Sequence, residues 1–123
     1  MTVALDFTLA NNATFERSFT LLDDNSTVIP LAQTAIRMQI RPSANSTTIL
    51  LTATNAIGDM IGVTNLDAGV VDLLISAKTL RSIPGGAYVY DIIVQHPSGR
   101  VWRPFAGSIT LLAGVTELVK VTS

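Results

Sequence analysis

Hydrophobic and polar residues alternate with a period of two along most of the chain, and this alternation predicts β-strands buried on one face. In the clearest case Ile36, Met38 and Ile40 alternate with two arginines and a glutamine, and Pro42 ends the segment. The same pattern predicts further strands over 3–9, 15–21, 48–54, 60–64, 71–75, 88–94, 101–105, 108–113 and 115–121. Strand signals that recur about every 8–12 residues are typical of a sandwich or a barrel.

Turn-forming residues separate these segments. Asp and Asn side chains bond to nearby backbone, so Asp23–Ser26 and Asn65–Gly69 are expected to form turns, and His96–Gly99 a hairpin turn. Ser76 has the character of a helix N-cap, and Ala77–Ile83 is expected to form one helical turn. Gly107 and Gly114 interrupt the alternation near the end of the chain, and Arg17 stands within an otherwise apolar strand pattern.

These elements predict an all-β domain that spans residues 1–123, with no linker, repeat or low-complexity tract. We expect two packed antiparallel sheets of about seven to nine strands and one short helical turn. Tyr88 or Tyr90 is expected to anchor the corner after Pro84–Gly86 through its hydroxyl. The expected core comprises Ile36, Met38, Ile40, Leu73, Ile75, Tyr90 and Ile92.

Composition narrows the function classes. The chain is 48% hydrophobic and only 14% charged, and its net charge of −1 gives no electrostatic footprint for nucleic acid. The absence of cysteine excludes disulfides and thiolate metal sites. Low charge fits a protein that buries surface against partners, although an ordinary sandwich with Thr and Ser at its exposed positions is the alternative.

The sequence gives no sign of a membrane segment or a signal peptide. No apolar stretch approaches the roughly 20 residues that a membrane helix needs. The segment Met1–Asp6 has neither a basic start nor a long apolar run. We therefore expect synthesis in a cytoplasm and no membrane partner.

Candidate chemistry is sparse, and we expect neither an enzyme nor a bound cofactor or metal. His96 is the only imidazole and lies in a turn, and nothing in the sequence holds it near Ser98 and Asp91 as a catalytic set would require. The acidic run Asp23–Asn25 lacks the ligand spacing and the glycine of a calcium loop.

Two parts of the chain are candidates for an interface. An aromatic and basic cluster, Trp102, Arg103 and Phe105, is explained either by contact with a partner or glycan or by cross-strand packing. The two terminal segments, Thr2–Leu9 and Val115–Val121, are apolar, alternating and free of proline. One of them is therefore expected at an interface, unless both are ordinary strands inside the sandwich. Their candidate interface residues are Val3, Leu5, Phe7, Val119 and Val121.

A longer pattern resembles a known class of protein. It runs through 12–15, 19–21, 35–41, 67–77, 84–92, 96–101 and 107–111, and includes Pro-Gly-Gly-Ala-Tyr-Val-Tyr-Asp-Ile at 84–92. Together these strand and turn patterns resemble the small β-sandwich proteins of tailed bacteriophages and prophages, found among tail, baseplate and fibre components. They are also similar to the N-terminal domain of some baseplate upper proteins. The Gly-x-Tyr-x-Tyr pattern at 86–90 is in addition similar to immunoglobulin-like domains, although the paired cysteines of antibody domains are missing.

The resemblance implies an immunoglobulin-like sandwich and a structural role in a virion. The expected function is that of a tail, neck or baseplate adaptor or a fibre-attachment protein, with other virion proteins as partners and many copies, or a homo-oligomer, in the particle. A capsid decoration protein that stabilises the shell is the first alternative, and a carbohydrate-binding module on a fibre, with a surface glycan as partner, is the second. The expected location is the virion, after synthesis in the bacterial host.

Overall fold

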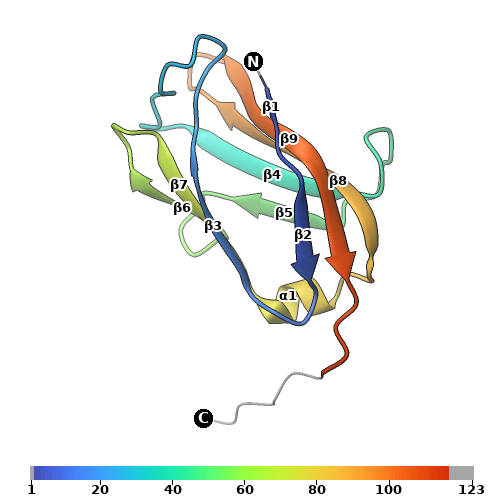
Figure 1. Cartoon of the computed structure of the whole chain (residues 1–123). Helices are drawn as coiled ribbons and strands as arrows, with labels where there is room; N and C mark the ends of the chain where they lie inside the picture. Colours follow the sequence, from blue (N-terminus) through green and yellow to red (C-terminus); the bar gives the residue numbers. More distant parts are fainter. Residues whose placement is uncertain (1, 117–123) are drawn as a thin grey trace, which may run out of the picture.

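A computed structural model describes residues 2–116 and contains two β-sheets packed face to face, with one short helix at an end of the sandwich (Figure 1). Nine strands lie within these residues. Their bounds are β1 Val3–Ala4, β2 Phe7–Ala10, β3 Phe15–Thr20, β4 Ala35–Arg41, β5 Leu51–Thr54, β6 Ile61–Asn65, β7 Val70–Ile75, β8 Gly86–Gln95 and β9 Val101–Leu112. The helix α1 spans Ala77–Arg81.

The strand order is that of an immunoglobulin-like sandwich. The large sheet has the order β1-β9-β8-β4-β5, with β2 also paired to β9, and the small sheet has the order β3-β7-β6. Strands β9, β8 and β4 are adjacent as strands G, F and C are in an immunoglobulin domain, and β3, β7 and β6 as strands B, E and D are. The predicted all-β, two-sheet fold is confirmed. The strand pairs are antiparallel as expected, except that β1 and β2 both run parallel to β9.

Alternation places the core as predicted. In β4 Ile36, Met38 and Ile40 are buried, and the polar residues between them face outward. All seven residues of the expected core are buried, namely Ile36, Met38, Ile40, Leu73, Ile75, Tyr90 and Ile92. Burial of one such side chain stabilises the fold by about 1.5–3 kcal/mol, so the inward faces of the two sheets hold the sandwich together.

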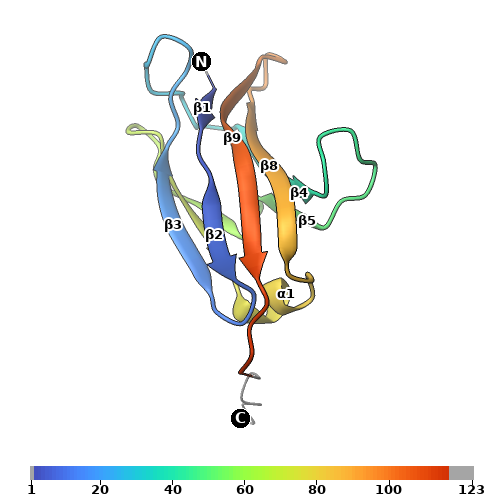
Figure 2. The same ribbon diagram turned by 45° about the vertical axis from the view of Figure 1, so that its right-hand side comes forward.

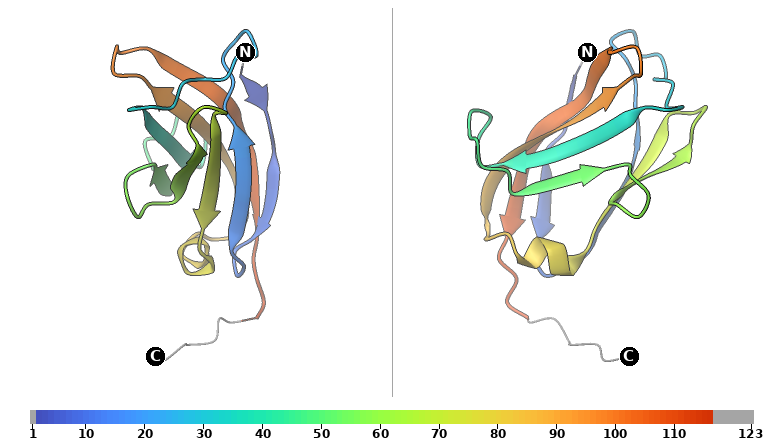
Figure 3. Two further views of the ribbon diagram at one scale, coloured as in Figure 1. Left: turned by 90° about the vertical axis from the view of Figure 1, so that its left-hand side faces the viewer. Right: turned by 180° about the vertical axis from the view of Figure 1, so that it is seen from behind.

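The predicted helical turn and its corner are also present. The Ser76 hydroxyl oxygen accepts a hydrogen bond from the backbone nitrogen of Thr79 at 3.1 Å, which caps α1 as expected. After the helix, the Tyr88 hydroxyl donates to the carbonyl oxygen of Pro84 at 2.5 Å and so anchors the corner before β8. The helix lies at the end of the sandwich where β2 and β9 end (Figure 3). Across residues 2–116, no helix has the length and apolarity that crossing a lipid bilayer requires.

The last strand differs from its prediction. Segments 101–105 and 108–113 were expected as two strands broken at Gly107, whereas β9 runs unbroken from Val101 to Leu112. Gly107 lies within the ladder, opposite Tyr90. A Cβ at Gly107 would lie only 2.2 Å from the Leu5 carbonyl oxygen, so the glycine permits the N-terminal segment to approach β9 closely.

A β-bulge accommodates the proline of this strand. Between the pairs Ile92–Phe105 and Val94–Trp102, β9 has one residue more than β8. The extra length includes Pro104, which cannot donate a ladder hydrogen bond and is therefore tolerated where pairing is interrupted.

The N-terminal segment is attached to β9 at Leu5 and Asp6, between β1 and β2. The Asp6 carboxylate accepts a hydrogen bond from the backbone nitrogen of Ser108 at 2.9 Å, and the Tyr90 hydroxyl donates to the Leu5 carbonyl oxygen at 2.6 Å. Burial, with the Asp6 charge as a smaller contribution, raises the pKa of the Tyr90 hydroxyl to about 12. The hydroxyl therefore stays protonated and can donate throughout the neutral range.

The boundary of another predicted strand also differs from its prediction. The segment 48–54 forms a strand only from Leu51, and Ile49 is exposed in the loop before it. Of the predicted strand 115–121, the structure describes only Val115 and Thr116, which lie beyond the end of β9 at Leu112. Residues 117–121 of that segment lie outside the described residues.

Candidate functional site

The outer face of the large sheet is the candidate site. Alternation turns every second side chain of β4 and β8 away from the core, and the pairing register places these outward residues opposite each other. The outward residues of β8 are Val89, Asp91 and Ile93, and their partners on β4 are Arg41, Gln39 and Arg37. Arg103 of β9 reaches the same face through its contact with Asp91.

This face contains a shallow hollow of about 460 Å³. Its lining includes Gln39, Arg41, Val89, Asp91 and Arg103, which come from three adjacent strands. A second hollow of about 320 Å³ adjoins it and includes Arg37, and Ile93 lines both. The face therefore combines apolar side chains with arginines over a broad, shallow area.

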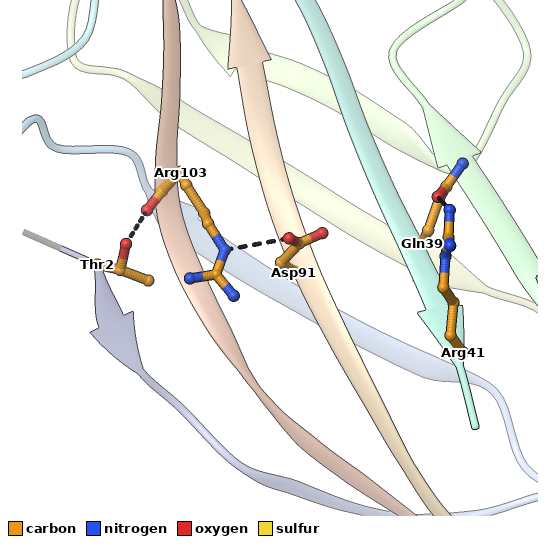
Figure 4. Close-up of polar contacts among 5 residues, drawn as sticks. All are labelled: Thr2, Gln39, Arg41, Asp91 and Arg103. Carbon is orange, nitrogen blue, oxygen red and sulfur yellow. Dashed lines mark hydrogen bonds and ion pairs between the residues drawn. The ribbon is translucent and has the colours of Figure 1, made fainter. Parts of the chain in front are cut away.

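Asp91 and Arg103 form the ion pair of the hollow (Figure 4). The Nε of Arg103 donates to the Asp91 carboxylate at 3.1 Å, and the two side chains are 53% and 41% exposed. At such exposure a pair contributes only about 0–1 kcal/mol. The backbone carbonyl of Arg103 accepts a hydrogen bond from the Thr2 hydroxyl at 2.8 Å. The terminal nitrogens of Arg103 make no hydrogen bond within residues 2–116 and remain available to another acceptor.

Arg41 is held in a fixed position instead. Its two terminal nitrogens donate to the Ser46 carbonyl oxygen and to the Gln39 side-chain oxygen, each at 2.8 Å. The first bond ties Arg41 to the loop between β4 and β5, which projects from the body of the sandwich (Figure 2). Gln39 and Arg41 lie along the same strand on the outer face (Figure 4). The positive charge of Arg41 is therefore held in one position on the outer face.

Strand β8 is apolar on both of its faces. Its inward residues pack in the core, while Val89 and Ile93 are half-buried on the outer face on either side of Asp91. Strands that read as near-continuous apolar runs are usually covered on both sides. In residues 2–116 only the small sheet covers this strand, on its inner face. The outer face of β8 therefore carries aliphatic side chains that no second sheet within residues 2–116 covers.

The residues predicted for an interface are spread over different environments. Arg103 lies on the outer face, whereas Phe7 is buried and contacts the rings of Phe15, Phe19 and Tyr90 at centroid distances of 5.4, 6.0 and 5.6 Å. Substitution of Phe7 therefore changes the core first. The Arg17 guanidinium lies 5.2 Å from the Phe7 ring centroid, which explains a charge in an apolar strand pattern.

The other predicted interface residues are not brought together on one surface. Val3 is exposed, while Leu5 and Phe105 are half-buried, and Phe105 contacts the ring of Phe19 at 5.2 Å. Val119 and Val121 lie outside the described residues.

Trp102 packs against the β8–β9 hairpin. The Arg100 guanidinium lies 5.0 Å from the ring centroid of Trp102, and the His96 ring meets it edge-on at 6.1 Å. Its indole nitrogen is buried without a hydrogen-bond partner in the described residues. Neither Trp102 nor Tyr88 lines the two hollows of the outer face.

The candidate catalytic and calcium-binding residues stabilise turns. The Nδ1 of His96 lies 2.8 Å from the Ser98 hydroxyl and accepts a hydrogen bond from the Ser98 backbone nitrogen, which closes the hairpin. One Asp23 oxygen accepts hydrogen bonds from the backbone nitrogens of Asn25 and Thr27, each at 2.9 Å. Asp91 is paired with Arg103 on another part of the surface. Among the described residues, no three His, Cys, Asp or Glu side chains cluster as a metal site would require.

No protein-family model matches the chain, and no curated protein matches it either.

Sequence reasoning missed the outer face of the large sheet as a candidate site. The signal was the run Tyr-Val-Tyr-Asp-Ile-Ile-Val at 88–94, which carries apolar residues at both odd and even positions. The strand was predicted from the apolar residues at the even positions alone, and Val89 and Ile93 at odd positions were not considered. The three arginines became neighbours of Val89 and Ile93 only through pairing across strands.

Proposed function

We propose that the chain is a non-enzymatic structural component of a tailed-phage particle, with the role of a tail, neck or baseplate adaptor or a fibre-attachment protein. It docks on a neighbouring virion protein through the outer face of the large sheet. The resemblance to small phage β-sandwich proteins supports the setting. The structure supports the mode of binding, because this face carries side chains of the kinds found at protein interfaces.

A single observation carries the proposal, namely the two-sided apolar character of β8. Val89 and Ile93 are half-buried on a broad face next to Arg37, Arg41 and Arg103. Arginine is enriched at protein interfaces, and apolar side chains rimmed by polar ones mark interaction surfaces. The hollow is shallow and formed by regular strands, which suits a flat protein partner.

The test is substitution of Ile93 by Lys, since this places a charge in the middle of the proposed contact. Because Ile93 faces outward, the variant is expected to fold with an unchanged circular dichroism spectrum and to be lost from assembled particles. Substitution of Ile57 by Lys is the matched control, because Ile57 is fully exposed in the loop after β5. Ile57→Lys should be incorporated like the wild-type chain.

The measurement is the amount of each variant in purified particles, compared with that of the wild-type chain. Incorporation of folded Ile93→Lys at the wild-type level would show that this face does not dock the chain. Separation of particles into heads and tails then distinguishes an adaptor of the tail from a capsid decoration protein, because the chain should stay with the tail fraction.

A further inference from the structure

The two outer faces of the sandwich carry opposite charge. On the large sheet, the outer face has Arg37, Arg41 and Arg103 against Asp91, which leaves a net positive charge. On the small sheet, the outward residues of β3 and β7 include Glu16 and no arginine or lysine. Asp72 adds a second carboxylate to that face and accepts a hydrogen bond from the Ser18 hydroxyl. The two faces therefore differ in the sign of their charge, although the whole chain has a net charge of only −1.

Each of the two faces also has an apolar part. Leu74 is 48% exposed at the outward side of β7, where it pairs with Glu16, and Val70 is half-buried on the same face. On the other face, Val89 and Ile93 lie between the arginines. Each face therefore has aliphatic side chains beside charges, and these charges are opposite in sign to those on the other face of a second copy.

We propose that copies of this chain associate head to tail, with the outer face of the large sheet of one copy on the outer face of the small sheet of the next. The inference deepens the proposed function, on which it rests, by naming a second copy as the occupant of the docking face. A face-to-face dimer through the large sheet would instead oppose Arg37, Arg41 and Arg103 to the same residues of the partner. Like charges opposed in this way weaken association.

A head-to-tail contact can be repeated from copy to copy. Because the two faces of the sandwich point in opposite directions, each copy that uses one face leaves the other face free for a further copy. A heterologous contact of this kind produces a ring where the rotation closes and a filament where it does not. Salt screens exposed charge pairs, so association through these faces is expected to weaken as the ionic strength rises.

The test uses two charge-reversal variants of the full chain. The first carries Arg37→Glu and Arg103→Glu on the large sheet, and the second carries Glu16→Lys and Asp72→Lys on the small sheet. Sedimentation velocity at low ionic strength should show concentration-dependent association of the wild-type chain. Either variant alone should associate more weakly by about tenfold or more, because both of its faces then have the same sign of charge. Circular dichroism and thermal unfolding establish that each variant is folded.

An equimolar mixture of the two variants provides the discriminating result. The second variant retains the basic face and the first retains the acidic face, so the native contact can form between them and association should return. A chain carrying all four substitutions should also self-associate, with the charges exchanged between its faces. A purely structural effect of either pair of substitutions would not be reversed by mixing.

Three results would overturn the proposal. The first is a wild-type chain that stays monomeric at every concentration. The second is a small-sheet variant that associates like the wild type, since this would indicate a different partner for the basic face. The third is failure of the mixture to associate when both variants are folded. If Ile93→Lys is nevertheless lost from particles, the docking face stands and only its occupant is wrong. If the mixture associates but Ile93→Lys enters particles normally, the proposed function fails and self-association stands.

Discussion

Two tyrosines on the same strand use their hydroxyl groups to hold two different backbone segments. The Tyr88 hydroxyl donates to the Pro84 carbonyl oxygen and fixes the corner between α1 and β8. The Tyr90 hydroxyl donates to Leu5, 85 residues away in the sequence, and fixes the N-terminal segment against β9. The first bond is local and stabilises a turn, whereas the second joins the N-terminal segment to β8.

Substitution of each tyrosine by Phe removes one hydrogen bond and keeps the ring. We expect Tyr88→Phe and Tyr90→Phe each to lower the free energy of unfolding by about 0.5–1.5 kcal/mol, the usual net contribution of one hydrogen bond. Urea denaturation of the two variants and the wild type measures this. Wild-type stability in both variants would show that neither hydroxyl anchors the fold.

The raised pKa of Tyr90 predicts a loss of stability at high pH. Its ordinary pKa of 10.0 applies in the unfolded chain and rises to about 12 in the folded protein. Between these values the unfolded chain loses the proton and the folded chain keeps it, so deprotonation favours unfolding. The contribution of Tyr90 is complete below pH 10 and disappears as the pH rises toward 12. The denaturation midpoint should therefore fall over this interval, and by less in Tyr90→Phe, while an equal fall in that variant would assign the effect to other groups.

At the scale of elements, the attachment of the N-terminal segment depends on a glycine inside a strand. Gly107 faces Tyr90 in the β8–β9 ladder, and the Leu5 carbonyl oxygen occupies the space that a side chain at 107 would need. The sequence showed a glycine between two apolar runs, and such a glycine is equally consistent with a turn or with close approach of another backbone. Only the presence of Leu5 decides between them, and that contact is far away in the sequence.

Substitution of Gly107 by Ala tests this role. The added Cβ would lie 2.2 Å from the Leu5 carbonyl oxygen, so β1, β2 or β9 must shift, and we expect a loss of about 1–3 kcal/mol in the free energy of unfolding. Gly62→Ala is the matched control, because Gly62 is also in a strand and has no atom within 4 Å of its added Cβ. That variant should be close to wild type in chemical denaturation. Equal stability of both variants would mean that the N-terminal segment is not closely packed at Gly107.

Elements that are determined by nearby residues were predicted well. β4 and α1 follow from local alternation and from the Ser76 cap, and both appear where the sequence places them. One error follows from a distant contact, since the continuity of β9 depends on Leu5. Another is a strand boundary, because β5 begins only at Leu51 and leaves Ile49 exposed in the loop before it. The parallel pairing of β1 and β2 with β9 also leaves no local signal in the sequence.

At the scale of the whole molecule, the candidate site illustrates a limit of sequence reasoning. Apolar and aromatic content selected Phe7 and Phe105 as interface residues, yet Phe7 is in the core and Phe105 packs against it. The outer face is defined by the register, which places Arg37 opposite Ile93 although these two residues are more than 50 positions apart in the sequence. Pairing across strands therefore decides which residues form a surface, and the local sequence pattern does not predict which distant strands pair or in which register.

The whole fold depends on the N-terminal strands, and a stepwise truncation is expected to show this. β9 lies inside the large sheet because β1 and β2 cover its outer edge, and Phe7 pairs with Ile109 across that junction (Figure 2). Removal of residues 1–4 deletes only β1, whose two residues are exposed, and we expect cooperative unfolding to persist with a small loss of stability. Removal of residues 1–10 also deletes Phe7 and Leu9 from the core and leaves the edge of β9 unpaired, so the remaining chain should lose its cooperative transition and aggregate. Thermal unfolding followed by circular dichroism distinguishes the two truncations. A cooperative transition in the chain that begins at residue 11 would show that the sandwich does not need its first two strands.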